Sequence, residues 1–231
     1  MLVGDSTEWV GRFRSLDARF MERIAEVWPD CLSRLPSQPH EDTITANLVN
    51  HRQRDPGVRR YFHWIGFQYE PFGYTPERMA YSRGRVDMAV LLDQDRDTYL
   101  AYECKRLNVK SGSGRRSLAG KYVRDGISRF VKGQYSESLP VGCMLGYVLD
   151  GDLGFATARV HAKIVECRRL IALVDGPRSD DAIGCAIRYY SRHRREATGG
   201  EIEVRHALLP MCLHPEAGIG RGHLALAPPL A

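Results

Sequence analysis

The chain lacks any hydrophobic segment that could cross a membrane. No apolar run approaches the roughly 20 residues that a spanning helix needs. The N-terminal residues also lack the basic-then-apolar order of a signal peptide. We therefore expect a cytoplasmic protein without a membrane partner. The 231 residues, 43% hydrophobic and 26% charged, are sufficient for one substantial globular domain.

Several catalytic and metal-binding patterns are missing as well. The six cysteines include no Cys-x-x-Cys pair and the eight histidines no His-x-x-x-His pair, which argues against a zinc site. There is no Gly-x-Ser-x-Gly motif for a serine nucleophile. Residues 218–222 are glycine-rich but lack the Lys-Ser/Thr of a phosphate-binding loop. The scattered cysteines are expected to be reduced thiols.

The hydrophobic pattern predicts an alternation of helices and strands. Helices are predicted at 9–28, 41–54, 120–137 and 156–170, and strands at 61–69, 86–93, 98–104, 142–149, 185–191 and 202–208. Pro29 is expected to help end the first helix, and 71–79 is expected to be a loop.

This order predicts an α/β (α+β) fold, with a central mixed β-sheet flanked by helices. We expect residues 1–40 to form an N-terminal helical extension, 41–212 the main domain and 213–231 a flexible tail.

Two carboxylates face each other in one predicted β-hairpin. The apolar segments 86–93 and 98–104 flank a polar turn centred on Asp95. With that centre Asp87 lies opposite Glu103, where Cβ atoms are about 5 Å apart. Lys105 projects from the same face as Glu103 because side chains alternate along a strand. Two carboxylates so placed repel unless a cation lies between them, so the sequence predicts a divalent-metal site with an adjacent ammonium group.

Such a site has the groups that phosphodiester hydrolysis requires. Mg²⁺ is typically held by a few carboxylates while it keeps several waters. Asp87 and Glu103 are therefore candidate metal ligands, and the Cys104 carbonyl lies between the site residues and could complete the set. Lys105 is a candidate for orienting or deprotonating the attacking water.

Asp87 followed by Glu103-x-Lys105 resembles the PD-(D/E)XK nuclease superfamily, which has the restriction-endonuclease-like fold. The resemblance covers about residues 41–150: an acidic residue on a helix precedes the hairpin, and a basic amphipathic helix and a buried strand follow it. Val86 stands where the family motif often has proline. The helix that contains Tyr122, Gly126 and Arg129 is similar to helices of bacterial restriction and phage-defence nucleases.

The resemblance implies roles for individual residues. Asp87 and Glu103 would bind Mg²⁺, which Mn²⁺ would be able to replace, and Lys105 would serve the attacking water. Glu41 would assist the metal shell and thus be a fourth catalytic residue. The neighbouring Asp42 is the competing choice, because acidic residues are favoured in the first turn of any helix.

The net charge of +5 weakly favours an anionic partner. The segment 106–116 is predicted to be a mobile basic loop leading into the basic helix. Candidate phosphate-binding residues are Arg106, Lys110, Arg115, Arg116, Lys121 and Arg129. The alternative is that these side chains are only solvated surface charges.

The leading hypothesis is a Mg²⁺-dependent deoxyribonuclease in bacterial restriction, phage defence or DNA repair. It could act as a homodimer or with partner subunits, because no motor or methyltransferase segment is evident. One alternative is a nucleic-acid-binding or assembly subunit that keeps the nuclease fold without catalysis. Another is a metal-dependent enzyme that acts on RNA or on a small phosphoester.

Overall fold

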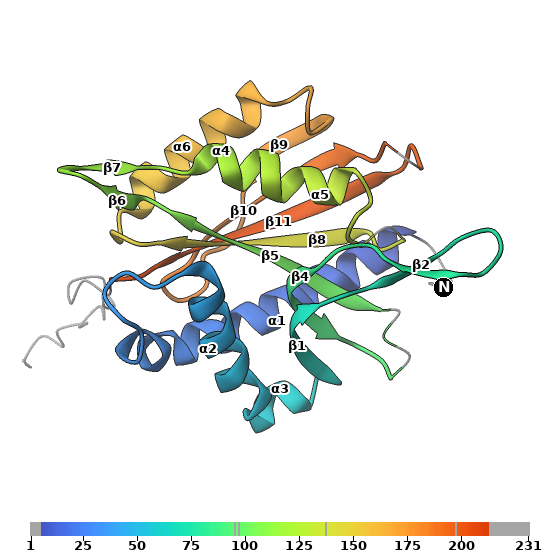
Figure 1. Ribbon diagram of the computed structural model, residues 1–231, viewed down its shortest axis with the longest axis horizontal. Coiled ribbons are helices and arrows are strands. Elements are labelled where there is room, and N and C mark those ends of the chain that lie inside the picture. Colours follow the sequence, from blue (N-terminus) through green and yellow to red (C-terminus); the bar gives the residue numbers. More distant parts are fainter. Residues whose placement is uncertain (1–5, 95, 97, 137, 197, 213–231) are drawn as a thin grey trace, which may run out of the picture.

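The described part of the computed structural model comprises residues 6–94, 96, 98–136, 138–196 and 198–212. It is an α/β protein built on a seven-stranded mixed sheet with the strand order β1-β4-β5-β8-β11-β10-β9 (Figure 1). The strands are β1 (Trp64–Tyr69), β4 (Val86–Leu91), β5 (Tyr99–Leu107), β8 (Val141–Val148), β9 (Leu173–Ser179), β10 (Ile187–Arg194) and β11 (Glu201–Pro210). Strands β5, β8 and β11 are parallel, and the remaining neighbours are antiparallel.

Helices cover both faces of this sheet. One side carries α1 (Ser6–Ser33), α2 (Glu41–Gln53) and α3 (Pro56–Arg59), and the other carries α4 (Ala119–Lys121), η1 (Tyr122–Ile127), α5 (Ser128–Val131) and α6 (Leu153–Glu166) (Figure 1). The predicted mixed sheet flanked by helices is thus confirmed. No helix in the described ranges is long and apolar enough to span a bilayer.

The N-terminal helix α1 is part of the main core. Phe13, Phe20, Ile24 and Trp28 are fully buried in the same hydrophobic cluster as the sheet. The Trp28 ring stacks on Tyr147 of β8 at 5.9 Å. Burial of such side chains contributes about 1.5–3 kcal/mol each to folding, so the segment predicted as an extension packs as a layer of the domain.

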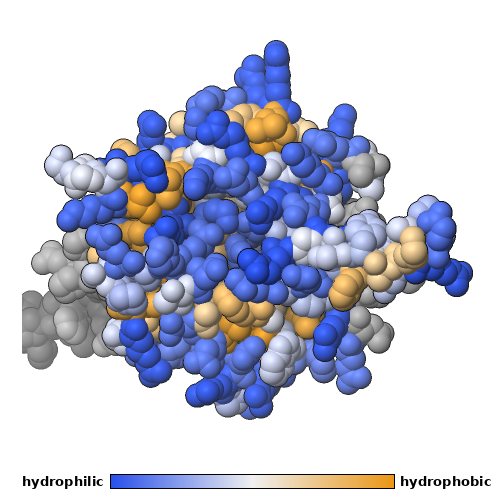
Figure 2. All heavy atoms as spheres, in the orientation of Figure 1, coloured by the Kyte–Doolittle hydropathy of each residue, from blue (hydrophilic) through white to orange (hydrophobic). Residues whose placement is uncertain are grey.

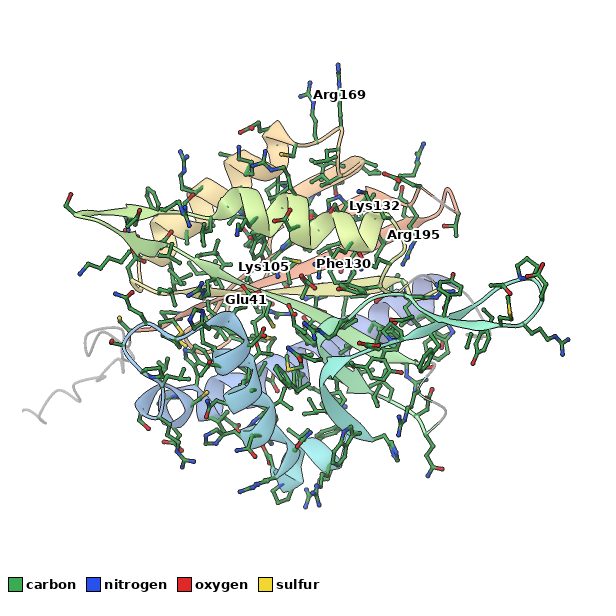
Figure 3. The ribbon with its side chains drawn as sticks, viewed as in Figure 1. Glu41, Lys105, Phe130, Lys132, Arg169 and Arg195 are labelled. Atoms are coloured by element: carbon green, nitrogen blue, oxygen red, sulfur yellow. The ribbon has the colours of Figure 1, made fainter. Side chains whose placement is uncertain are left out.

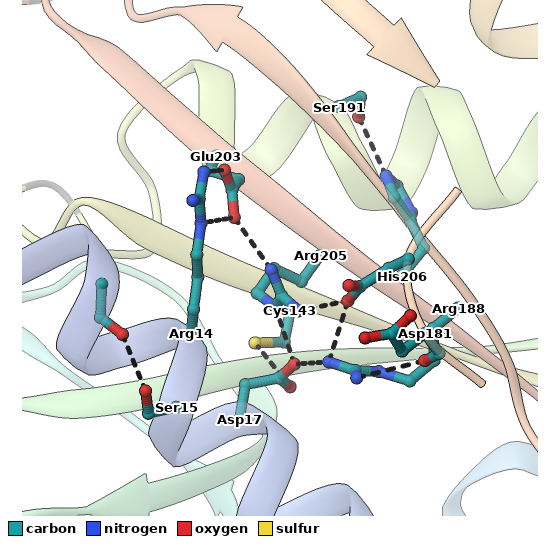
Figure 4. A network of polar contacts seen from close by, with 12 residues as sticks. Arg14, Ser15, Asp17, Cys143, Asp181, Arg188, Ser191, Glu203, Arg205 and His206 are labelled. Atoms are coloured by element: carbon teal, nitrogen blue, oxygen red, sulfur yellow. Dashed lines mark hydrogen bonds and ion pairs between the residues drawn. The ribbon is translucent and has the colours of Figure 1, made fainter. Parts of the chain in front are cut away.

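A buried charge network also joins α1 to the sheet (Figure 4). Asp17 accepts bonds from Arg188 at 2.6 Å and from Arg205 at 2.8 Å. Arg205 also bonds Glu203 of its own strand at 3.0 Å, and Glu203 is in turn paired with Arg14 of α1. These contacts link α1 to β10 and β11.

The predicted β4–β5 hairpin is present in the predicted register. Met88 pairs with Tyr102 and Leu91 with Tyr99, as expected for a turn centred on residue 95. Both strands are largely buried, because they lie inside the sheet between β1 and β8. Residue 95 itself and the predicted tail at 213–231 lie outside the described residues.

The structure corrects three local predictions. Pro29 lies inside α1 rather than at its end. The predicted loop after Lys105 is instead the end of β5 followed by a hairpin of β6 (Val109–Ser111) and β7 (Gly114–Arg116). The segment predicted as a loop at 71–79 contains β2 (Phe72–Tyr74), which pairs with β3 (Ala80–Ser82). In addition, the sequence prediction missed strand β9, a half-buried strand with little hydrophobic alternation.

The helix after β7 contains a π-helical turn between two short α-helical segments. The predicted amphipathic character of this helix is confirmed, since its apolar residues Tyr122, Ile127 and Phe130 are fully buried. Gly126 lets this helix approach the sheet closely: a Cβ there would meet the Met144 side chain at 2.4 Å and lie 3.7 Å from Cγ of Glu103. Single π-turns frequently occur at functional sites.

Candidate functional site

Four oxygen-bearing groups surround the ammonium group of Lys105. Its Nζ lies 2.8 Å from Oε1 of Glu103, 3.0 Å from Oε1 of Glu41 and 3.6 Å from Oδ2 of Asp87. It also donates to the Cys104 carbonyl at 2.7 Å. The groups predicted from sequence therefore converge on one point. Figure 3 shows Lys105 next to Glu41, which lies at the start of α2.

Glu103 is fully buried on β5, on the side covered by the π-turn and α5. Nη1 of Arg129 bonds both of its oxygens, at 2.9 and 3.1 Å. The same nitrogen donates to the Tyr135 hydroxyl at 2.7 Å, and that hydroxyl donates to the Arg85 carbonyl. Arg129 and Tyr135 thus hold Glu103 in one orientation.

Asp87 and Glu41 are each held by a backbone amide of β5. Oδ2 of Asp87 accepts from the Cys104 amide at 2.7 Å, and Oε2 of Glu41 accepts from the Arg106 amide at 2.9 Å. Both carboxylates keep partial exposure, 17% for Asp87 and 26% for Glu41. Asp42, the competing choice, instead accepts from Gln68 at 3.1 Å. The contact with Lys105 therefore selects Glu41.

Burial and mutual repulsion change the proton affinities of the site. Burial, with a further contribution from Asp87, raises the pKa of Glu103 to about 7. Burial likewise raises the pKa of Asp87. Burial alone would lower the pKa of Lys105, but Glu103, Asp87 and Glu41 outweigh it and raise that pKa. Such perturbed groups in a cleft are typical of functional sites.

The site opens into a cavity of about 460 Å³ between α2 and the helix that follows β7. A second cavity, of about 640 Å³, adjoins it, because His40, Arg106, Leu118 and Lys121 line both. Hydrophilic residues dominate the corresponding face of the molecule (Figure 2). We refer to these two adjoining cavities, which extend from Lys105 to residues of the β6–β7 hairpin, as the cleft.

Five of the six residues predicted to bind phosphate lie along the second cavity. They are Arg106, Lys110, Arg115, Arg116 and Lys121. Arg115 is paired with Asp150 at 2.6 Å and with Asp152 at 2.8 Å, so its charge is already compensated. Arg129 lines the first cavity, but its guanidinium is directed at Glu103. If Arg129 binds phosphate, its guanidinium has to contact the phosphate and the Glu103 carboxylate at the same time.

The donor set is chemically appropriate for Mg²⁺, which prefers oxygen ligands. Glu41, Asp87, Glu103 and the Cys104 carbonyl supply only oxygen atoms, and all four approach one cationic centre. Among the described residues, however, no group of three or more His, Cys, Asp or Glu side chains is arranged to hold a metal ion. The oxygens are arranged around the ammonium group of Lys105.

Sequence reasoning missed the contact between Arg129 and Glu103. The sequence predicts Arg129 as a phosphate-binding residue because it is a basic residue of the amphipathic helix. A π-helical turn, Tyr122–Ile127, lies just before Arg129 in the chain. The sequence signal that could have indicated this is Gly126, a residue that permits close approach of helix and strand.

We also compared the chain with known proteins. No protein-family model matches the chain, and neither the curated proteins nor the solved structures contain a significant match to it.

Proposed function

We propose that this protein is a Mg²⁺-dependent nuclease of the PD-(D/E)XK type that hydrolyses DNA phosphodiester bonds. The observation that carries the proposal is the convergence of Glu41, Asp87 and Glu103 on Lys105 at the end of a basic cleft. Hydrolysis of a phosphodiester needs an oriented water, compensation of phosphate charge and a stabilised leaving oxygen. The proposed restriction-endonuclease-like fold accommodates all three in this one cleft.

Each residue of the cluster has a proposed role. Asp87, Glu103 and the Cys104 carbonyl would hold Mg²⁺, and Glu41 would support that shell. When bound, the ion would supply Lewis-acid stabilisation and a water of lowered pKa. Lys105 would orient the attacking water and stabilise the negative charge that develops on the phosphate. Arg129 and Tyr135 hold the Glu103 carboxylate beside Lys105, which lines the cleft.

The cleft gives the nucleic acid a path. Lys110, Arg116 and Lys121 are exposed cations along its wall and would bind successive phosphates of a DNA strand. Contacts of this kind position the strand without reading its sequence. Partner subunits of a defence or restriction complex, or a second copy of the chain, would then supply target selection.

The test is cleavage of supercoiled and linear DNA with Mg²⁺ or Mn²⁺ by the wild type and by Asp87→Ala and Lys105→Ala variants. The matched control is Asp30→Asn, an exposed carboxylate on α1. We expect cleavage by the wild type and the control, and none by the two site variants.

Cleavage that survives in both site variants would show that the site assignment is wrong. Salt-sensitive DNA binding without cleavage of any DNA or RNA would instead favour the non-catalytic assembly subunit. Cleavage of RNA but not of DNA would retain the site and change the substrate.

A further inference from the structure

Large exposed apolar side chains gather in one short stretch of the chain. Seven lie between residues 61 and 81: Tyr61, Trp64, Phe67, Phe72, Tyr74, Met79 and Tyr81. Elsewhere in the described residues only Val165, Leu170 and Val174 are comparable. An exposed apolar concentration of this kind marks an interaction surface.

The most exposed of these aromatic rings share one face of the β2–β3 hairpin. Phe72 and Tyr74 are 63% and 67% exposed and lie two residues apart on β2, so both point to the same side. Their partners across the hairpin are Ser82 and Ala80, which are small. The two rings therefore have no bulky neighbour from the paired strand.

The opposite face of this hairpin carries a single ring, that of Tyr81, which is less exposed at 48%. The Tyr81 ring lies across Gly73, where a Cβ would come within 2.5 Å of it. The guanidinium of Arg83 lies 6.0 Å from the centre of that ring. The face of Phe72 and Tyr74 is thus the more exposed of the two, and Figure 2 shows apolar residues along this projecting arm.

The base of the hairpin is connected to the candidate site. Gly84, with a φ of +114°, packs against the side chain of Gln134. The next carbonyl, that of Arg85, accepts from the Tyr135 hydroxyl, which accepts from Arg129 and so leads to Glu103. In Figure 1 this hairpin projects at the opposite end of the molecule from β6–β7. The cleft therefore lies between a basic hairpin and an aromatic one.

We propose that the β2–β3 hairpin is an arm that stacks on unpaired bases of the nucleic acid bound at the candidate site, an inference that rests on the proposed function. Phe72 and Tyr74 are about 6.8 Å apart along the strand. This spacing corresponds to two steps of about 3.4 Å in a nucleic-acid strand, so one base can lie between the two rings.

The net charge of the arm also favours binding of a nucleic-acid strand, which is negatively charged. Exposed Arg78 at its tip and exposed Arg85 at its base carry positive charge beside the rings, and Arg83 adds a third cation. Two acidic residues, Glu70 and Glu77, accompany them, which leaves a net positive arm. Aromatic rings flanked by arginines bind single strands with little sequence preference, because every base presents a π-face. Bases inside a duplex are already stacked and do not offer that face.

The test compares binding of a labelled single-stranded oligonucleotide with binding of the duplex of the same sequence, both in an Asp87→Asn background that prevents cleavage. The test variant is Phe72→Ser/Tyr74→Ser, and the matched control is Val165→Ser/Leu170→Ser, two exposed apolar residues remote in sequence. We expect single-strand affinity to fall about 10- to 100-fold in the test variant, with duplex affinity unchanged. Phe72→Trp/Tyr74→Trp should retain single-strand binding, and 2-aminopurine in the strand should be quenched by proteins that keep aromatic rings at positions 72 and 74 but not by the test variant.

Three outcomes overturn the proposal. Unchanged single-strand affinity in the test variant, while the wild type cleaves DNA, overturns the arm and leaves the nuclease intact. A wild-type dimer that the test variant converts to monomer in sedimentation assigns the rings to contact between copies. Absence of both cleavage and nucleic-acid binding in the wild type overturns the proposed function and the arm with it.

Discussion

Two clusters of carboxylates and basic side chains are buried in this protein, and they differ in their charge balance. The network beneath α1 pairs Asp17, Asp180 and Glu203 with Arg14, Arg188 and Arg205. The candidate site has three carboxylates, Glu41, Asp87 and Glu103, but only two cations, Lys105 and Arg129. One cluster is electrically balanced and the other has a spare negative charge.

The pKa values of the buried carboxylates reflect this difference in charge balance: the pKa is lowered in the balanced cluster and raised in the cluster with a spare negative charge. Burial alone would raise the pKa of Asp17, but Arg205 and Arg188 outweigh it, so that pKa is lowered. The pKa of Glu103 is raised despite its two cationic neighbours. A buried group that keeps its ordinary charge stabilises the fold, whereas one that is short of compensation is prepared to bind a cation or a proton. The comparison therefore separates a structural network from a candidate catalytic one.

The largest effect should follow removal of the charge on Glu103. Glu103→Gln should lower the DNA cleavage rate at least about 1,000-fold, about 4 kcal/mol of transition-state stabilisation, without lowering the free energy of unfolding. The physical reason is that the amide cannot replace a carboxylate as a metal ligand, while the repulsion with Asp87 disappears. Cleavage assays and urea unfolding on the same preparation measure both quantities. A variant that loses stability together with activity would place Glu103 among the structural carboxylates.

The reverse result is expected for Asp17. Asp17→Ala leaves Arg188 and Arg205 without a buried counter-charge, which costs about 3–5 kcal/mol of stability. The matched control is Asp180→Asn, because Asp180 is 24% exposed and its loss should cost less. Urea unfolding measures the difference, and cleavage per folded molecule should be unchanged. An equal loss in both variants would contradict the assignment of Asp17 to the centre of the network.

The two clusters should also respond oppositely to pH. The folded pKa of Glu103 lies above its unfolded value, so its contribution to stability is complete below the unfolded pKa and is lost as pH rises through about 7. Between about pH 5 and pH 8 the wild type should lose about 1–3 kcal/mol relative to Glu103→Gln. Asp17 has a lowered pKa, so its contribution is lost only as the pH falls below the usual aspartate range. Urea unfolding at each pH measures these free energies. If the wild type and Glu103→Gln lose stability in parallel between about pH 5 and pH 8, Glu103 does not titrate in this range.

The smallest effect concerns the wall of the cleft. Lys121→Ala should weaken DNA binding and reduce the slope of log affinity against log salt by about 1. Arg115→Ala should do less, because Asp150 and Asp152 already compensate its guanidinium. Arg169, exposed and distant from Lys105 in Figure 3, provides the control variant Arg169→Ala. Equal slopes for Lys121→Ala and this control would remove Lys121 from the DNA path.

The hairpin and its carboxylates could be predicted because both depend on local rules. Alternation along β4 and β5 and one polar turn fixed which residues oppose each other, and the observed register agrees. Glu41 was also foreseen, as an acidic residue at a helix start, although sequence left it equivalent to Asp42. The choice between them depends on the direction from which α2 approaches β5, which no local pattern contains.

Contacts between distant segments were the ones that local rules missed. Arg129 lies 26 residues from Glu103 in the chain, and the two side chains meet only once the helix after β7 packs on the sheet. The segment predicted as an extension became a core layer because Asp17 and Trp28 find partners near the C-terminal end of the described chain. Long-range charge pairing is not encoded in periodicity, so sequence alone gives no sign of it.

The sequence by itself determined the sheet-and-helix class, the β4–β5 register and the placing of Asp87, Glu103 and Lys105 on adjacent strands, because each depends on spacing along a single strand or helix. Only the tertiary structure decided which carboxylates are left without full compensation. The physical reason is that the net charge around each carboxylate depends on side chains from β4, β5, α2 and α5. These side chains come together only once the chain is folded.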